Sequence, residues 1–299
     1  MTASAPTQPH GLPALPCYLN GEFTTLPEAK VSVMDRGFLL GDGVYEVIPA
    51  YDGRLFRFNE HMARLERSLA ELRIANPMTP ARWKDIALRL LAGHAALAGP
   101  GPQAVYIQVT RGVAMREHIM VKGLVPTVFA MVNAASSPLE RQRAQGVACV
   151  TAEDFRWRKA HIKAISLLGS VFARQISADA GAAETVMFRD GFLSEGASSN
   201  VWVVKDGTVL GALRDNLVLE GIRYGLIESL CRDAGIPFQL RRINRDEVGQ
   251  ADEIMLSSAG KEVLPVTLLD GQPVGNGAPG PIYKKLYEGY QRAKQAQPA

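Results

Sequence analysis

A run of small and polar residues interrupts the pattern of helices and strands near the middle of the chain. Residues 133–138 read Asn-Ala-Ala-Ser-Ser-Pro, which favours neither a strand nor an amphipathic helix. The chain has 299 residues, 47% of them hydrophobic, so each half can bury a core of its own. We therefore predict a flexible N-terminal tail over residues 1–16, a small domain over 17–135 and a large domain over 136–299.

The first half combines short strands with two amphipathic helices. Asn20–Gly21 lies between two short apolar runs, which indicates a tight β-hairpin. Apolar residues at three- and four-residue steps predict one helix over 59–74 and another over 83–97. Alternating apolar residues then predict strands over 105–110 and 127–132. This half is therefore expected to be an α+β domain.

The second half also mixes strands and helices. Its short strands, separated by Asp-Gly turns, predict an antiparallel meander. The expected elements are strands over 147–151, 184–188, 201–204 and 254–257, and helices over 167–178, 221–234 and 282–294. The predicted fold class is α+β, with two domains.

Charge and cysteine content exclude several classes of protein. The net charge is only +3, from 33 basic and 30 acidic residues, so neither nucleic acid nor an anionic membrane is required as a partner. Cys17, Cys149 and Cys231 are far apart, which fits neither a disulfide framework nor a metal site. No apolar run reaches the length of a membrane span. We expect a cytoplasmic protein that binds small molecules and needs no metal.

One lysine and one carboxylate form a pair that suits a cofactor held as a Schiff base. Lys163 has apolar neighbours in Ile162 and Ala164, and Glu195 lies downstream in Leu-Ser-Glu-Gly-Ala-Ser-Ser-Asn. A lysine can hold pyridoxal 5′-phosphate (PLP) as a Schiff base, and a carboxylate can keep the pyridine nitrogen of PLP protonated. Two plainer interpretations stay open here: a surface lysine, and a turn carboxylate that accepts hydrogen bonds from nearby backbone amides.

Other residues could bind the anionic groups of a cofactor or a substrate. Leu219–Arg223 enters a predicted helix, whose first N–H groups suit a phosphate, and Arg64 could add a charge. Arg116 and His118 lie in a polar loop, where a guanidinium can hold a carboxylate through two parallel hydrogen bonds. An ordinary helix start and surface charges explain the same residues equally well.

A series of short motifs also occurs in a fixed order along the chain. The motifs are Asp35–Arg36–Gly37, Gly41–Glu46, Asn59–His61 with Arg64, Gln108–Gly112, Ile162–Lys163, Leu167–Gly169, Glu195–Gly196 with Ser198–Asn200, Leu219 with Gly221–Ile222, and Glu262 with Pro265–Val266. In these motifs the chain resembles the fold-type IV PLP-dependent enzymes, which include D-amino-acid transaminases, branched-chain aminotransferases and aminodeoxychorismate lyase. The resemblance extends from about Tyr18 to Tyr290 and is strongest to the D-amino-acid transaminases.

The resemblance implies a cofactor, PLP, and a set of residues that bind it. Lys163 would be the catalytic residue that holds PLP as a Schiff base, and Glu195 would pair with the pyridine nitrogen. The remaining implied cofactor-binding residues are Arg64, Leu219, Ile222, Arg223, Ser258, Ala259 and Gly260. Where similar enzymes carry hydroxyl side chains, this chain has Ala259 and Gly260, so a side-chain contact to the phosphate is lost.

The resemblance also implies a reaction. A D-amino acid of the D-alanine type would give its amino group to 2-oxoglutarate, yielding pyruvate or another 2-oxo acid and D-glutamate. Tyr45, Arg116 and His118 would bind the substrate carboxylate, with the arginine and histidine coming from the neighbouring subunit of a homodimer. The end of the pocket that anchors the carboxylate selects D or L substrates, because Lys163 takes a proton from one face only.

Other activities of the same fold remain as alternatives. An (R)-amine or L-branched-chain transaminase is possible because one fold allows several pockets, and the L-branched-chain enzyme would anchor the carboxylate at the turn of residues 257–260. Aminodeoxychorismate lyase is a third enzyme hypothesis. Outside enzymes, the chain could be a PLP-binding or carrier protein without turnover.

Overall fold

The computed structural model describes residues 11–135 and 138–296. These divide into two compact units, one of residues 11–135 with 162–166, and one of residues 138–161 with 167–296. Residues 1–10 of the predicted tail and residues 136–137 at the predicted domain boundary lie outside the described residues.

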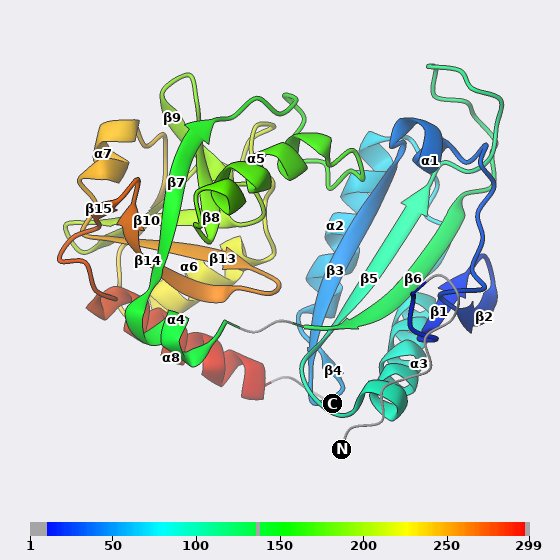
Figure 1. Ribbon diagram of the computed structural model, residues 1–299, viewed down its shortest axis with the longest axis horizontal. Coiled ribbons are helices and arrows are strands. Elements are labelled where there is room, and N and C mark those ends of the chain that lie inside the picture. The colour runs from blue at the N-terminus through cyan, green and yellow to red at the C-terminus, as the bar shows by residue number, and fades with distance from the viewer. Residues whose placement is uncertain (1–10, 136–137, 297–299) are drawn as a thin grey trace. The chain divides into compact units, whose positions relative to one another are not determined.

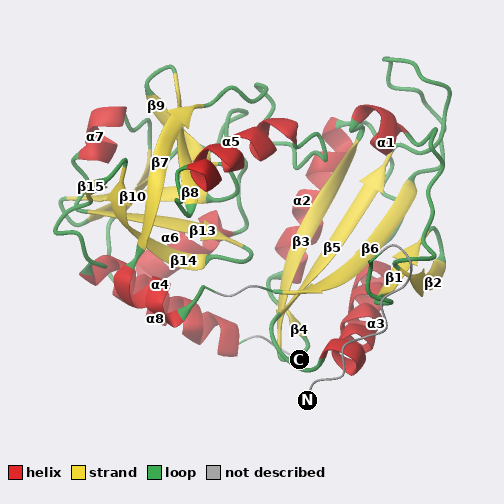
Figure 2. Ribbon diagram, viewed as in Figure 1, coloured by secondary structure: helices red, strands yellow, loops and turns green. Residues whose placement is uncertain are grey.

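The first unit is built on a six-stranded antiparallel sheet in the order β2-β1-β6-β5-β3-β4 (Figure 1). Helices α2 and α3 lie along the sheet, and α1 is a short helix before β3 (Figure 2). The elements are β1 (Pro16–Leu19), β2 (Glu22–Thr25), α1 (Arg36–Leu40), β3 (Gly43–Tyr51), β4 (Arg54–Leu55), α2 (Phe58–Glu71), α3 (Pro80–Ala98), β5 (Gln103–Thr110) and β6 (Thr127–Ala134).

Local sequence explains most of these boundaries. The predicted Asn-Gly hairpin is confirmed, with Asn20 in the left-handed region at φ 49°. Helix α3 begins with Thr79 as its cap, because the Thr79 side chain accepts a hydrogen bond from Arg82 N. Helix α2 ends at Glu71, three residues short of the predicted end. Arg73 is left-handed at φ 53°, so Ile74 reaches the core from outside the helix.

The second unit contains a nine-stranded mixed sheet in which β12-β11-β10-β13-β14-β7-β8-β9 are neighbours and β15 pairs with β14. The strands are β7 (Val147–Glu153), β8 (Glu184–Arg189), β9 (Phe192–Gly196), β10 (Asn200–Lys205), β11 (Thr208–Gly211), β12 (Phe238–Leu240), β13 (Glu253–Ser258), β14 (Glu262–Leu269) and β15 (Gln272–Pro273). The helices are α4 (Glu140–Gln145), α5 (Leu168–Asp179), α6 (Arg223–Asp233), α7 (Arg245–Gly249) and α8 (Pro281–Gln295).

The prediction of one antiparallel meander in this unit is wrong. β8–β9 and β10–β11 are separate hairpins, and β10 takes β13 rather than β9 as its other neighbour. The chain turns away between them, because Ala197 N donates to Thr185 O and the hydroxyls of Ser198 and Ser199 donate to Glu184. This connecting segment directly follows Glu195, so the break in the meander shapes the candidate site.

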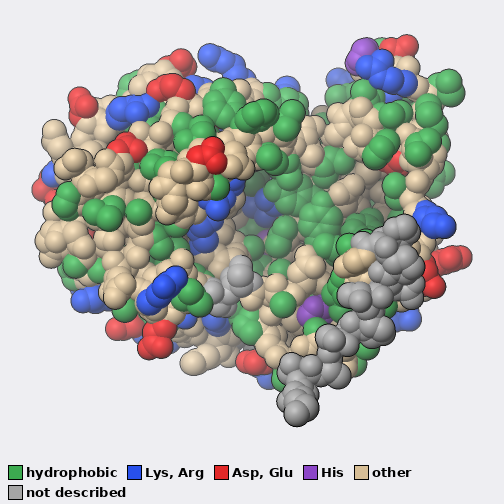
Figure 3. All heavy atoms as spheres, in the orientation of Figure 1, with side chains coloured by type: hydrophobic (Ala, Val, Ile, Leu, Met, Phe, Trp, Pro, Cys, Tyr) green, Lys and Arg blue, Asp and Glu red, His purple; other side chains and the backbone are tan. Residues whose placement is uncertain are grey.

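The three cysteines are buried free thiols. No helix in the described residues has the length and apolar character to cross a membrane. The face drawn in Figure 3 carries both basic and acidic side chains.

Candidate functional site

Lys163 lies on a short segment that pairs with the start of β3 in the first unit. Tyr45 N donates to Lys163 O at 3.0 Å, and Lys163 N donates to Ser68 Oγ at 3.3 Å. Ile162 and Ala164 on either side are buried in the core of this unit. The backbone of Lys163 is therefore fixed, while its side chain is only half-buried.

The structure brings two predicted site residues together at this point. Nζ of Lys163 lies 4.3 Å from the centroid of the Tyr45 ring. Tyr45 in turn stacks on Tyr106 of β5, with the ring centroids 5.8 Å apart. The structure thus places the amine of Lys163 beside an aromatic ring at the start of β3.

Arg64 of α2, a predicted phosphate ligand, forms a buried ion pair with Glu46 of β3, the strand that carries Tyr45. Nε and Nη2 of Arg64 donate to the two carboxylate oxygens of Glu46 at 2.7 and 2.8 Å, and His61 Nδ1 lies 2.7 Å from Glu46 Oε2. Burial raises the pKa of Glu46, but Arg64 and His61 outweigh it and hold this pKa well below the usual range. Glu46 therefore orients Arg64 from one side.

Arg116 and His118 are exposed in the loop between β5 and β6, with Arg116 Nη2 3.4 Å from His118 Nε2. A buried arginine, Arg36, holds the base of this loop. Its Nη1 donates to Glu117 O at 2.6 Å and its Nη2 donates to Ile119 O at 3.0 Å, so the two carbonyls bracket His118. Sequence reasoning assigned no role to Arg36, although the residue belongs to one of the ordered motifs.

Arg36 is itself held by a carboxylate that it shares with a second arginine. Arg36 Nε donates to Asp42 Oδ2 at 2.8 Å, and Arg111 donates to both oxygens of Asp42 at 2.7 and 3.0 Å. Burial raises the pKa of Asp42, but the two arginines outweigh it, so the pKa is lowered. This ionic network ties the loop to the end of β5.

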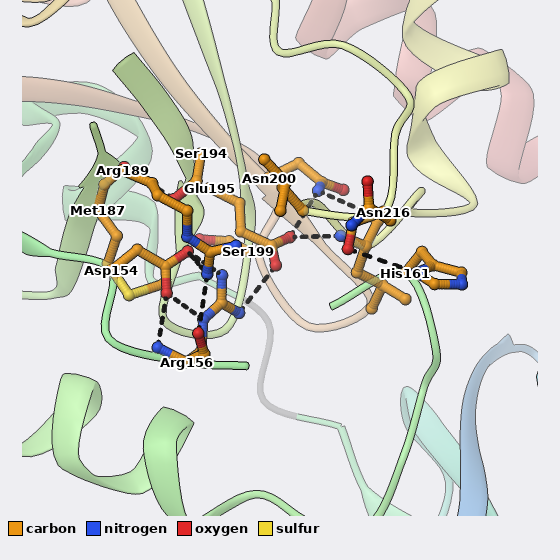
Figure 4. Close-up of polar contacts among 12 residues, drawn as sticks. Asp154, Arg156, His161, Met187, Arg189, Ser194, Glu195, Ser199, Asn200 and Asn216 are labelled. Atoms are coloured by element: carbon orange, nitrogen blue, oxygen red, sulfur yellow. Dashed lines mark hydrogen bonds and ion pairs between the residues drawn. The ribbon is translucent and has the colours of Figure 1, made fainter. Parts of the chain in front are cut away.

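Glu195 lies at the centre of the second group of site residues, at the end of β9 (Figure 4). The side chain is buried, and its Oε1 accepts a hydrogen bond from Arg156 Nη1 at 2.8 Å. Its Oε2 accepts from Asn200 Nδ2 and from Leu219 N, both at 3.3 Å. Two of these partners are side chains, and the third is the backbone amide of Leu219, 24 positions away in the sequence. A carboxylate that only stabilises its own turn would instead accept hydrogen bonds from neighbouring backbone amides.

Arg156, which sequence reasoning missed, is a charged partner of Glu195. Asp154 accepts from Nε and Nη2 of Arg156, both at 2.9 Å, and also pairs with Arg189 at 3.0 Å (Figure 4). Burial raises the pKa of Glu195, and the neighbouring Arg156 guanidinium opposes that shift. The carboxylate is thus oriented by a guanidinium that is fixed in place by another carboxylate.

Asn200 connects Glu195 with the residues before α6. Besides its contact to Glu195, its Nδ2 donates to Leu219 O at 3.0 Å. A β-carbon on residue 221 would lie 2.0 Å from Asn200 Oδ1, so only glycine fits at Gly221 without moving that amide. In the described part of the chain, no side chain caps α6 at Ile222, which leaves its first turn suited to an anion. The Arg223 side chain donates to the hydroxyl of Tyr290 instead.

The turn between β13 and β14 carries the last predicted cofactor residues. Across the β10–β13 pair Asn200 is opposite Ser257, which places this turn next to the Glu195 group. Ser258 Oγ accepts from Lys261 N at 3.1 Å. The amides of Ala259 and Gly260 donate to none of the described residues, so they are available to an anion.

Taken separately, the two units supply the groups that PLP requires. The first offers an amine on a fixed backbone, Lys163, and the second offers an oriented carboxylate, Glu195. Backbone donors for a phosphate lie at the start of α6 and in the turn at Ala259–Gly260. The donor set therefore fits this cofactor.

Known proteins match the chain over most of its length. The sequence profile described as "Amino-transferase class IV" matches residues 43–269. The chain is 38% identical over 274 residues to a D-alanine aminotransferase of Bacillus licheniformis, covering 92% of this chain and 95% of the relative. It is 37% identical over 280 residues to a D-alanine aminotransferase of Staphylococcus epidermidis, covering 93% and 98%.

Solved structures agree with the fold. A branched-chain amino acid aminotransferase of T.th., crystallised with pyridoxamine 5′-phosphate, superposes with a TM-score of 0.86 at 25% identity, covering 95% of each chain. A fold IV transaminase from Curtobacterium pusillum gives a TM-score of 0.79 at 25% identity, covering 93% of this chain and 94% of the other. The expected two-domain fold class is thereby confirmed.

Proposed function

Because the chain belongs to the class IV aminotransferases, we propose that it is a PLP-dependent D-amino-acid transaminase. It moves the amino group of a D-alanine-type donor to 2-oxoglutarate, giving pyruvate or another 2-oxo acid and D-glutamate. The observation that carries this proposal is the position of Lys163, whose amine lies beside Tyr45, the residue expected to bind the substrate carboxylate. The 37–38% identity to D-alanine aminotransferases over most of the chain supports it.

Each group of residues has a separate task in this proposal. Bound PLP would supply a ring that accepts the electrons released when the Cα–H bond of the amino acid breaks. Lys163 would hold the cofactor covalently, and its free amine would accept the Cα proton at Nζ. The hydrogen bonds of its backbone to Tyr45 and Ser68 limit how far that amine can move.

The cofactor ring and its phosphate would be held by residues of the second unit, Glu195 among them, together with Arg64. The Glu195 carboxylate would keep the proton on the ring nitrogen, and Leu219 would pack against the ring. The phosphate would accept hydrogen bonds from the backbone at Ile222–Arg223 and at the turn Ser258–Gly260, and Arg64 would contribute its charge.

The substrate carboxylate would be anchored by Tyr45 with Arg116 and His118. Replacing Arg116 with alanine is expected to lower kcat/KM for D-alanine about 100-fold, because truncation removes a charge-assisted anchor from a carboxylate. Steady-state kinetics with D-alanine and 2-oxoglutarate measures this. Arg82→Ala is the matched control, since Arg82 is exposed on α3 and pairs only with Asp85 in the described structure.

The donor preference separates the proposal from its alternatives. The purified protein is scanned for visible absorbance before and after addition of D-alanine, L-alanine, L-leucine or (R)-1-phenylethylamine. Loss of the band of bound cofactor with D-alanine alone supports the D-transaminase. Conversion by L-leucine that survives Arg116→Ala would instead identify an enzyme anchored at the turn 257–260. Release of pyruvate from aminodeoxychorismate without an acceptor would identify the lyase.

We further propose that the protein is a homodimer, in which Arg116 and His118 serve the neighbouring subunit. An apolar stripe on α5 supports this assembly, because Leu168, Val171 and Phe172 are 69%, 59% and 59% exposed. Such a continuous apolar surface is typical of a protein–protein contact.

A charge within this stripe is expected to separate the subunits. Phe172→Glu should convert the dimer to a monomer and remove most activity, because a desolvated carboxylate opposes association. Light scattering after size-exclusion chromatography measures the mass. Leu97→Glu, at an exposed apolar residue of α3, should leave the dimer intact. A Phe172→Glu protein that stays dimeric would rule out α5 as the contact.

A further inference from the structure

In the proposed function, the turn at residues 258–260 binds a phosphate without hydroxyl side chains at Ala259 and Gly260. Only its backbone amides and the Ser258 side chain can donate there, and the Ser258 oxygen already accepts from Lys261 N. Backbone amides bind an anion well only when the peptide groups are held in the binding geometry beforehand. The surrounding residues must therefore fix the turn.

Lys261, directly after the turn, makes contacts that can do this. Its Nζ donates to Glu184 Oε2 at 2.8 Å and to Ser198 Oγ at 2.9 Å. Glu184 is fully buried, and the same oxygen accepts from Ser198 Oγ at 2.7 Å and Ser199 Oγ at 2.9 Å. Lys261 thus ties the turn to the segment that follows Glu195.

The other side of the turn is fixed by a second ionic cluster. Glu262 is buried and left-handed at φ 55°, a conformation that a non-glycine residue keeps only when its surroundings hold it. Its carboxylate accepts from Arg143 at 3.2 Å, from Gln291 at 3.0 Å and from Lys294 at 2.7 Å. The turn is therefore held between two ionic clusters, one through Lys261 and one through Glu262.

We infer that Lys261 is a positioning residue that holds the turn Ser258–Gly260 in the conformation that binds the phosphate monoester of PLP. The ion pair with Glu184 compensates for the hydroxyl side chains that the turn lacks. This inference rests on the proposed function, because it takes the phosphate of PLP as the anion. The Nζ of Lys261 donates to Glu184 and Ser198, so the effect of Lys261 on the anion passes through the backbone of the turn.

The test compares PLP with pyridoxal, which lacks the phosphate. In Lys261→Met, PLP is expected to dissociate about tenfold faster, because the turn is no longer held in the conformation that binds the phosphate. The dissociation of pyridoxal, which makes no contact through a phosphate, should stay unchanged. Release is followed by the loss of visible absorbance after dilution. Lys205→Met is the matched control, because Lys205 is a lysine of the same unit that contacts Gln250 O and Asp252.

Two further variants sharpen the result. Lys261→Arg keeps the charge and should restore the preference for PLP over pyridoxal. Glu184→Gln should weaken PLP binding, and adding it to Lys261→Met should cause little further loss, as expected for residues that act as a pair. If Lys261→Met does not fold, Lys261→Gln, which keeps a donor but no charge, is measured instead.

The outcomes separate this inference from the proposed function. Equal losses of PLP and pyridoxal, or no loss of either, would overturn the positioning role of Lys261. A wild-type protein that binds pyridoxal as tightly as PLP, or neither of them, would overturn the proposed cofactor site itself.

Discussion

Replacing Lys163 with alanine is expected to lower kcat for transamination by about 10⁴-fold, because the variant loses the amine that holds the cofactor and moves the Cα proton. The fold should survive, since Ile162 and Ala164 keep their places in the core and the backbone hydrogen bonds to Tyr45 and Ser68 do not involve the side chain. Steady-state kinetics measures the loss of kcat, the absorbance spectrum shows whether the cofactor is still held, and the melting temperature shows whether the fold survives.

The matched control for this experiment is Lys30→Ala, which removes an exposed lysine of the same unit and should leave kcat unchanged. Adding a small primary amine such as ethylamine to the Lys163→Ala protein should restore part of the activity, because the free amine can take the proton that Lys163 took. A Lys163→Ala protein with wild-type turnover, or with an unchanged visible spectrum, would show that another residue holds the cofactor.

The sequence was sufficient to predict the fold class, because periodicity and ordered motifs are local properties. Most predicted helices and strands are present, with ends that differ by a few residues. The end of α2 was missed because it depends on one left-handed residue, Arg73, where no glycine marks the stop. The meander was mispredicted because hydrogen bonds of Ala197, Ser198 and Ser199 redirect the chain.

Long-range contacts account for what the sequence could not predict. Nothing local shows that residues 162–166 belong to the first unit, where they pair with β3 and place Ile162 and Ala164 in the core, which is what fixes Lys163. Arg156 was missed, since its contact with Glu195 joins residues 39 positions apart. Arg36 reaches carbonyls 81 and 83 positions away, so its hold on the Arg116 loop is equally invisible to a pattern.

The charge of Glu195 is the second feature whose removal should have a large effect. Glu195→Gln keeps the shape of the side chain but loses the negative charge, so the ring nitrogen of bound PLP no longer retains its proton as well. We expect kcat to fall about 100-fold, a typical loss when one oriented group stabilises charge in the reaction. Glu153→Gln is the matched control, because the Glu153 side chain is 70% exposed and pairs with Arg245 at the surface.

The pH profile distinguishes this electrostatic role from a structural one. A carboxylate beside the ring nitrogen raises the pKa of that nitrogen, so its removal in Glu195→Gln lowers the pKa and lets the proton leave as the pH rises. The kcat of Glu195→Gln should therefore decrease with increasing pH where the wild-type value is flat. If the variant acted only by displacing Arg156, kcat would fall equally at every pH. Asp154→Asn measures that structural effect, because it loosens Arg156 while Glu195 keeps its charge. A Glu195→Gln profile parallel to that of the wild type would mean that Glu195 supports the site only through its hydrogen bonds.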